Sequence, residues 1–359
     1  MKSSLSSNRP VANWIIIGVV MLLIQVILGG ITRLTGSGLS ITEWNVVTGS
    51  LPPLNEADWI EEFNKYQQTP QYRLLNADFN LSDFKNIFFW EWFHRLWARL
   101  IGVVFLVGFI YLTAKKYLKE EMVKPLLFLF LFGAFQGAIG WIMVASGLVG
   151  DAVYVKPTKL AMHFIFAMAL IGYAYWFALQ LTVSRNLRVY MPKWRGYTWA
   201  LIVLVGIQLV FGALMAGHKA ATAAPTWPTI NGDWFPESIF SHGFWFSMIE
   251  HKITVHFMHR NLAYLIAILI IVYTYKLKKM GKINHYFNGM RWIPLILVLV
   301  QVLLGIFAVL TSNTIIPNKW GSFEWFAQIH QIVGMLLLLS LIGMLYTFRK
   351  GNKIILKDN

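Results

Sequence analysis

Eight apolar stretches, each about 20 residues long, constrain the fold of this chain more than any other feature of its sequence. A helix of that length crosses the hydrocarbon core of a bilayer, and a helix satisfies its own backbone hydrogen bonds there. We therefore expect an all-α integral membrane protein with eight transmembrane helices. The stretches lie near residues 13–31, 93–114, 124–145, 160–182, 197–217, 253–275, 292–311 and 326–348.

Composition excludes a soluble enzyme, because only 13% of the 359 residues are charged and 57% are hydrophobic. Soluble proteins carry about 25% charged residues. Cysteine is absent, which excludes disulfides, thiolate nucleophiles, and zinc or iron–sulfur sites held by cysteine. Any metal must therefore be bound by histidine, methionine or carboxylate side chains.

The net charge of +15 comes from short basic clusters between the apolar stretches, so we expect no nucleic-acid partner. Alternate loops and tails carry 19 Lys and Arg residues on one side of the membrane and 9 on the other. The positive-inside rule then places both termini in the cytoplasm. Two long loops, 32–92 and 218–252, are expected to face outward.

The first long loop is predicted to contain a short helix. Asn55 and Asp58 can cap its start, and Trp59, Phe63 and Tyr66 recur at helical spacing along one face. Such an amphipathic helix is typical of a lid that lies at the membrane interface. Its polar face would carry Glu61, Glu62 and Lys65.

A repeated pattern runs through the eight stretches. Every odd-numbered stretch contains a Gln followed four residues later by a Gly, and every even-numbered stretch contains a histidine near its outer end. The Gln–Gly pairs are Gln25 with Gly29, Gln136 with Gly140, Gln208 with Gly212, and Gln301 with Gly305, and the histidines are His94, His163, His259 and His330.

The spacing of this pattern indicates an internal duplication of a four-helix module. His94 and His259 are 165 residues apart, and the second histidines of the two modules are 167 residues apart. The fold is therefore expected to be two duplicated four-helix bundles, residues 1–185 and 186–359.

The four histidines predict two haem sites. Because every even-numbered stretch begins on the outer side, the histidines should lie at similar depth, His94 with His163 and His259 with His330. Two imidazoles on facing helices in apolar surroundings suit axial ligation of haem iron. The alternative is that all four are hydrogen-bonded core histidines. Their matching positions within a duplication disfavour this alternative. The Gln residues are expected to bond to other helices, and the Gly residues to admit a flat macrocycle or a neighbouring backbone.

One position distinguishes the modules. Glu91 lies three residues before His94 on the same helical face, whereas His256 takes the equivalent place before His259. In an apolar pocket the pKa of Glu91 would rise, which suits proton transfer or stabilisation of developing positive charge. Alternatively, Glu91 is an interfacial carboxylate favoured by the N-terminus of its helix, and both interpretations are open at this stage.

Other charged and titratable residues have weaker assignments. Arg95, Arg260 and Lys159 are expected to meet haem propionates or phosphate headgroups near the outer edge. The histidines outside the pairs lie in or near expected loops, so we predict that they are solvated, and His256 is the one most worth testing. They are His218, His242, His251, His256 and His285.

Three motifs resemble those of the haem A synthase family. The resemblance extends from about Asn13 to Phe348. The motifs are Gly29-Gly30-Ile31-Thr32-Arg33-Leu34-Thr35 with Ser37-Gly38-Leu39-Ser40, then Glu91-Trp92-Phe93-His94-Arg95, and Gly140-Trp141-Ile142-Met143-Val144-Ala145-Ser146-Gly147-Leu148. The likeness is to the branch that lacks cysteines in the first outer loop, which mitochondrial and some bacterial members share. A thiol-based electron relay cannot operate in such a chain.

The resemblance implies oxidation of the C8 methyl group of haem O to a formyl group, which gives haem A for terminal oxidases, with haem b as the resident cofactor. It implies that His94 and His163 hold the substrate haem, with Glu91 as the functionally sensitive carboxylate. It implies that His259 and His330 hold haem b. The implied setting is the cell inner (cytoplasmic) membrane, with membrane lipid, haem O synthase and an electron-transfer protein as partners. A homo-oligomer is compatible with it.

Two features of the reaction stay open. If imidazole fills both axial positions of the substrate, its iron activates dioxygen only when one ligand leaves. Otherwise the ring edge is oxidised by electron removal and water supplies the oxygen.

Two rival functions are also open. A dihaem b-type membrane electron carrier would leave its haems unmodified, but ligands near one membrane face argue against transmembrane transfer. A transporter would need broken helices and a polar site at the midplane, and these stretches carry few charges there.

Overall fold

The computed structural model describes residues 9–43, 48–316 and 319–350, and within these ranges the chain forms helices and no named strand. Eight helices are long and apolar enough to cross a membrane, which confirms the predicted number of spans. The spanning helices are α1 (Arg9–Leu34), α4 (Leu81–Ala114), α5 (Glu120–Ala145), α6 (Pro157–Thr182), α7 (Pro192–Gly217), α9 (Lys252–Lys279), α11 (Ile293–Leu310) with α10 (His285–Met290) before it, and α12 (Ser322–Thr347).

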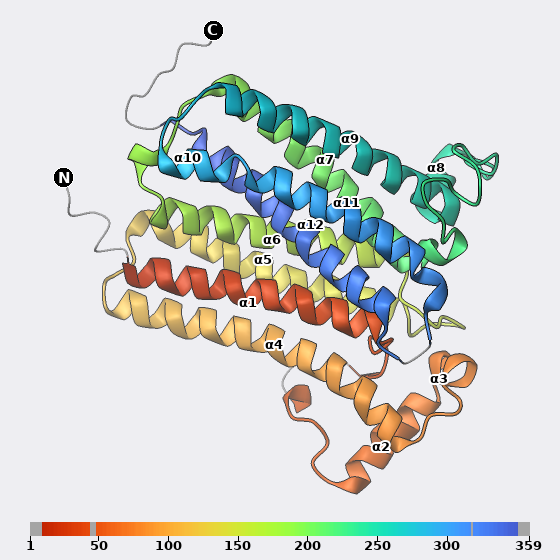
Figure 1. The fold of residues 1–359 in the computed structure, drawn as a ribbon. Helices are drawn as coiled ribbons and strands as arrows, with labels where there is room; N and C mark the ends of the chain where they lie inside the picture. The colour runs from red at the N-terminus through yellow and green to blue at the C-terminus, as the bar shows by residue number, and fades with distance from the viewer. Residues whose placement is uncertain (1–8, 44–47, 317–318, 351–359) are drawn as a thin grey trace.

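The spanning helices run side by side, and the described ends of the chain lie at one end of the bundle (Figure 1). The short helices α2 (Glu56–Gln67), α3 (Pro70–Leu75) and α8 (Phe244–Glu250) lie at the opposite end. The two long loops therefore share one side, as predicted. That this side faces away from the cytoplasm stays a prediction from the distribution of basic residues.

The two modules share a hydrophobic core. One cluster of buried side chains includes Val26 on α1, Ile171 on α6, Leu201 on α7 and Met335 on α12. Helix α12 is the innermost span: 67% of its most apolar window is buried, against 6% for α4 and for α5. The outer helices thus turn most of their surface to lipid, while α1, α6, α7 and α12 join the modules.

A polar contact joins α1 to α12 inside this apolar core. Gln328 Nε2 donates to the carbonyl of Ile27 and Gln331 Nε2 to the carbonyl of Val26, each over 3.0 Å. The two amides reach the α1 backbone because Gly30 has no side chain at that point. The Gln–Gly and His patterns did not reveal this contact.

We expect Gly30→Ala to lower the free energy of unfolding by about 1–3 kcal/mol. An added Cβ would lie 2.8 Å from Gln331 Nε2 and would overlap the Gln328 amide, so two buried hydrogen bonds would have to shift. Gly18→Ala on the same helix is the matched control, because its Cβ meets no atom within 4 Å. Unfolding of both variants in detergent measures the difference, and equal stability would contradict the role given to Gly30.

The predicted helix in the first long loop is confirmed as α2. The Asn55 side chain accepts from Asp58 N over 2.9 Å. The apolar face packs on the start of α4: the Trp59 and Phe88 ring centroids are 5.0 Å apart, and those of Tyr66 and Phe84 are 5.3 Å apart. Burial raises the pKa of Tyr66 to about 12.

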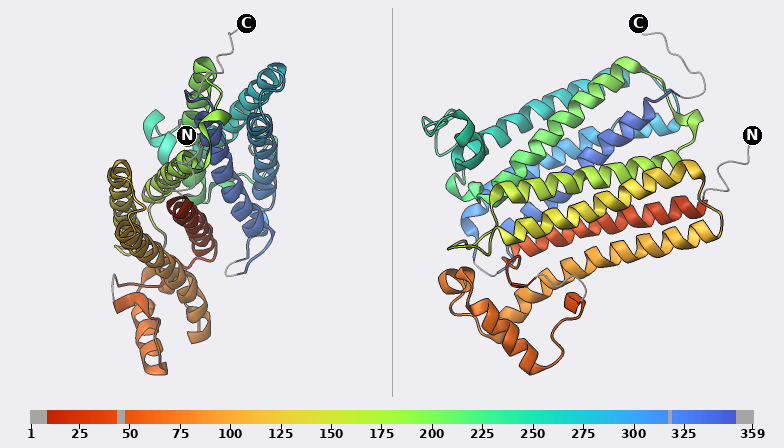
Figure 2. Two further views of the ribbon diagram at one scale, coloured as in Figure 1. Left: turned by 90° about the vertical axis from the view of Figure 1, so that its left-hand side faces the viewer. Right: turned by 180° about the vertical axis from the view of Figure 1, so that it is seen from behind.

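On the polar face of α2, Lys65 pairs with Glu43, Glu61 and Glu62. Hydrogen bonds from Lys65 to these carboxylates, the one to Glu62 above all, raise the pKa of the lysine. Figure 2 shows α2 and α3 extending beyond the ends of the spans. Contact of this unit with the membrane interface stays a prediction.

Helix α4 begins at Leu81, well before the predicted residue 93. A capping box starts it: the Asn80 side chain accepts from Asp83 N over 3.1 Å, and Asp83 accepts from Asn80 N over 3.0 Å. Glu91 therefore lies in the helix interior, because its place is more than two turns past the start. The alternative that the helix N-terminus stabilises Glu91 is wrong, since that effect fades within the first turn.

Candidate functional site

Each histidine of the repeated pattern lies against the Gln and Gly of the preceding spanning helix. In the α5–α6 pair, Gln136 Nε2 donates to the carbonyl of His163 over 2.9 Å and lies 3.1 Å from Nδ1 of the same ring. An added Cβ at Gly140 would lie 2.9 Å from Cε1 of His163. The glycine thus makes room for the imidazole of the paired helix, a contact that we did not predict. The approach of a flat macrocycle to this glycine stays a prediction.

The other three pairs repeat the Gly packing, and two of them also repeat the bond from Gln to the histidine carbonyl, whereas Gln301 Nε2 lies 3.2 Å from Nε2 of His330. The prediction that the Gln side chains bond across to other helices is confirmed. Gln25 Nε2 donates to the carbonyl of His94 over 3.2 Å, and Gln208 Nε2 to that of His259 over 2.9 Å. An added Cβ would lie 3.1 Å from Cε1 of His94 at Gly29, 3.2 Å from that of His259 at Gly212, and 3.0 Å from that of His330 at Gly305.

The fourth pair fixes the tautomer of its histidine. Nδ1 of His330 lies 3.1 Å from the backbone carbonyl of Gln301. A carbonyl oxygen only accepts, so Nδ1 carries the proton, and Nε2 accepts from Gln301 Nε2 over 3.2 Å. A metal-binding imidazole requires the same tautomer, and a metal on Nε2 would have to displace this amide.

His259 and His330 face each other across the second module, with ring centroids 6.2 Å apart and ring planes at 73°. With metal–nitrogen bonds of about 2 Å, two axial imidazoles on one iron place their ring centres roughly 6 Å apart. The pair therefore fits axial ligation of a haem. His94 and His163 lie on α4 and α6, each against the Gln and Gly of its paired helix.

We expect Gly212→Val to reduce bound haem in the second module, because the new side chain would push the His259 ring out of position. Gly206→Val on the same helix is the control, since a Cβ at Gly206 meets no atom within 4 Å. The haem absorbance per chain of each purified variant measures the effect. Equal absorbance in the two variants would show that the Gly212 clearance does not position His259.

Glu91 is 2% exposed, but it does not face an apolar pocket. Its Oε2 accepts from Ser40 N (2.7 Å), Ser40 Oγ (2.8 Å) and Ile41 N (3.0 Å), and its Oε1 accepts from Arg95 Nη2 (2.6 Å). Four donors match the acceptor sites of an ionised carboxylate. Glu91 therefore ties the first outer loop to α4 one turn from His94. The sequence pattern did not predict this link, although Ser40 and Glu91 both belong to the quoted motifs.

Arg95 and Arg260 each donate hydrogen bonds to backbone carbonyls in the outer loop of their module. Arg95 also donates to the carbonyls of Ile41 (3.2 Å) and Glu43 (3.1 Å). Arg260 donates to the carbonyls of Thr226 (2.9 Å), Pro228 (2.8 Å) and Thr229 (2.8 Å). Loop carbonyls are thus partners of both arginines, and their contact with propionates or headgroups stays a prediction.

Comparison with known proteins decides the family. Residues 12–342 match the family described as cytochrome oxidase assembly protein. A haem A synthase of Flavobacterium psychrophilum is 39% identical over 351 residues, which cover 96% of this chain and 100% of that protein. A haem A synthase of Paracoccus denitrificans is 40% identical over 306 residues, covering 84% of this chain and 80% of that protein. The chain belongs to the haem A synthase family.

Five histidines of the chain lie outside the two pairs. His256 is 1% exposed within α9, so our prediction that it is solvated is wrong. The apolar surroundings of a span exclude water from it. His242 and His251 lie beside α8 with ring centroids 5.3 Å apart, and burial, with the His242 charge, lowers the pKa of His251.

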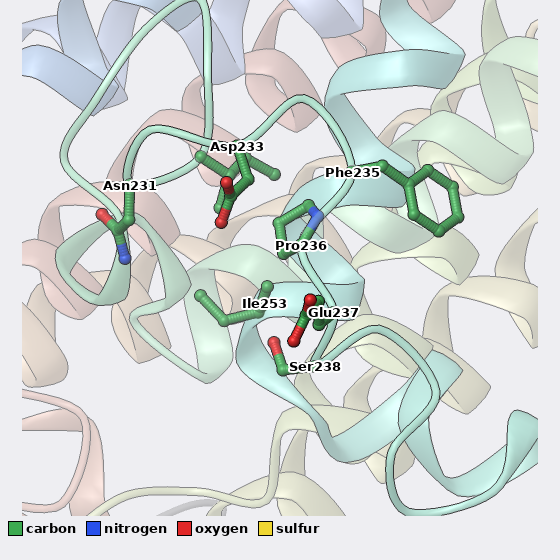
Figure 3. A pocket seen from close by; sticks show the side chains of 8 residues that line it. Asn231, Asp233, Phe235, Pro236, Glu237, Ser238 and Ile253 are labelled. Atoms are coloured by element: carbon green, nitrogen blue, oxygen red, sulfur yellow. The ribbon is translucent and has the colours of Figure 1, made fainter.

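A surface pocket in the second outer loop lies apart from the histidine pairs of this haem A synthase family member. Asp233, Glu237, Ser238 and Ile253 line it, and Phe235 points away from the two carboxylates (Figure 3). None of the four paired histidines lines this pocket. Its two carboxylates, Asp233 and Glu237, are exposed and do not belong to the candidate haem sites.

Proposed function

We propose that this protein is a haem A synthase, an oxidoreductase that converts the C8 methyl group of haem O to a formyl group. Relatives named haem A synthase align with most of the chain, and this supports the proposal. The observation that carries the proposal is the facing pair His259 and His330, whose 6.2 Å separation suits two axial ligands of one iron.

In this proposal His259 and His330 would hold haem b. Gln301 orients the His330 ring, and the Gly212 and Gly305 clearances let both rings lie close to their paired helices. When bound, haem b supplies a one-electron acceptor within the membrane.

His94 and His163 would hold the substrate haem O in the first module. Gln25 and Gln136 donate to the backbone carbonyls of these two histidines and also contact their rings, at 3.3 and 3.1 Å from Nδ1, so they would hold the imidazoles in place. Apolar side chains on the same helices exclude water from the substrate.

Glu91 would act as a fixed negative charge beside the substrate. Its donors hold the carboxylate in place before the reaction, and a preorganised charge stabilises positive charge that develops on the oxidised carbon. Because all four donors favour the anion, we assign Glu91 this electrostatic role in preference to that of a proton donor.

The proposed setting is the cell inner membrane, with both termini in the cytoplasm and the histidine pairs toward the outer side. His163, His259 and His330 lie within the first three turns of α6, α9 and α12. A source of haem O and an electron-transfer protein would be the partners. The shared depth of the ligands disfavours the rival function, a dihaem carrier that moves electrons across the membrane.

Mass analysis of extracted pigments tests the proposal. Membranes of a host that lacks haem A would contain this protein together with a haem O synthase. We expect haem A, and the same host without this protein should contain haem O only. Haem O as the sole product in both strains would reject the synthase and favour the electron carrier.

A further inference from the structure

His256 is a buried histidine with one nitrogen that has no partner. It is 1% exposed and lies on α9 three residues before His259, so the two rings project from the same face. Its Nε2 lies 2.9 Å from Arg260 Nη2. A guanidinium only donates, so Nε2 accepts and the ring proton is on Nδ1. This Nδ1–H is buried and finds no hydrogen-bond acceptor in the part of the chain that the structure describes.

In the first module, Glu91 takes the place equivalent to that of His256, and protein groups supply its partners. There Arg95 holds one oxygen of Glu91, as Arg260 holds one nitrogen of His256. The other Glu91 oxygen accepts from three donors of the first outer loop, including Ser40 N. The second outer loop gives His256 no such partner. The two modules thus differ at this place: the first has a carboxylate that accepts from four donors, and the second has an N–H donor that still needs an acceptor.

A buried N–H without an acceptor is costly, and nearly all buried polar groups in proteins are paired. The missing partner must be an acceptor, and it must reach a site one helical turn outward from His259. A porphyrin between His259 and His330 carries its carboxylates at one edge, and the polar edge is more stable toward the membrane surface than toward the bilayer centre.

We propose that the Nδ1–H of His256 binds a propionate carboxylate of the haem held by His259 and His330. Arg260 positions the imidazole by fixing its tautomer. The inference rests on the proposed haem b site. It also separates the two modules by function: the second binds a carboxylate and retains its haem, whereas the first presents the Glu91 anion at the equivalent place and so disfavours tight retention of its substrate.

Titration of the haem-free protein in detergent with two porphyrins tests the proposal. One is haem b and the other is its dimethyl ester, in which both carboxylates are blocked. Wild-type protein should bind haem b more tightly than the ester. His256→Phe should weaken haem b binding roughly 10- to 100-fold and leave the affinity for the ester nearly unchanged. His256→Gln keeps an N–H donor and should recover part of the preference for haem b.

The outcomes separate this inference from the haem site itself. Equal weakening of both porphyrins in both variants, or no change in either, would overturn the role of His256 while the haem site stands. Wild-type protein that binds neither porphyrin, or a His259→Ala variant that binds both as well as wild type, would overturn the proposed haem site and the inference with it.

Discussion

Replacing His259 or His330 by alanine is expected to abolish the b-type haem absorbance of the purified protein. The two rings face each other at 6.2 Å, and each variant removes one of the two axial nitrogens from the proposed iron site. Alanine supplies no ligand. Reduced-minus-oxidised spectra, with haem content per chain, measure the loss.

The control for this prediction is His285→Ala. His285 is exposed at the start of α10, far in sequence from both pairs, and it should keep the full haem content. Wild-type absorbance in both His259→Ala and His330→Ala would reject the assignment of these residues as cofactor ligands.

Glu91→Ala is expected to stop formation of haem A, or to trap a partly oxidised product, while haem b stays bound. The variant removes the proposed charge beside the substrate and leaves Arg95 without its carboxylate. Breaking a buried ion pair by removing one partner costs about 3–5 kcal/mol, so we also expect the first outer loop to loosen. Masses of the extracted pigments give the activity, and the haem b spectrum reports whether the second module is intact.

Two further variants separate the charge of Glu91 from its role as a loop anchor. Ser40→Ala removes one hydroxyl donor but keeps both the carboxylate and Arg95, so it should retain most of the activity. Glu237→Ala removes an exposed carboxylate of the other outer loop and should behave as wild type. A normal yield of haem A from Glu91→Ala would show that the carboxylate is structural only.

The spans could be predicted from the sequence because lipid demands continuous apolar helices, and that demand is visible in hydropathy alone. The start of α4 could not. Residues between Leu81 and Glu91 include Phe84 and Phe88, which pack against α2 and not against lipid. The capping box of Asn80 and Asp83 begins the helix in the outer loop, where hydropathy gives no signal.

The candidate ligands were also accessible from the sequence, because duplication repeats them at a fixed spacing. Their surroundings were not. The partners of Arg95 and Arg260 are backbone carbonyls of outer loops, and the sequence does not reveal where those carbonyls lie. The burial of His256 escaped prediction for a related reason: α9 begins at Lys252, and loop 226–229 folds over its first turns through Arg260.

The central claim is that each module holds one porphyrin between two histidines. An experimental density map of the protein, purified after co-expression with a haem O synthase, tests it most directly. We predict one flat density between His259 and His330 and a second between His94 and His163, with one nitrogen of each ring about 2 Å from an iron. Porphyrin density at any other place, or histidine rings turned away from the iron in both modules, would contradict the account.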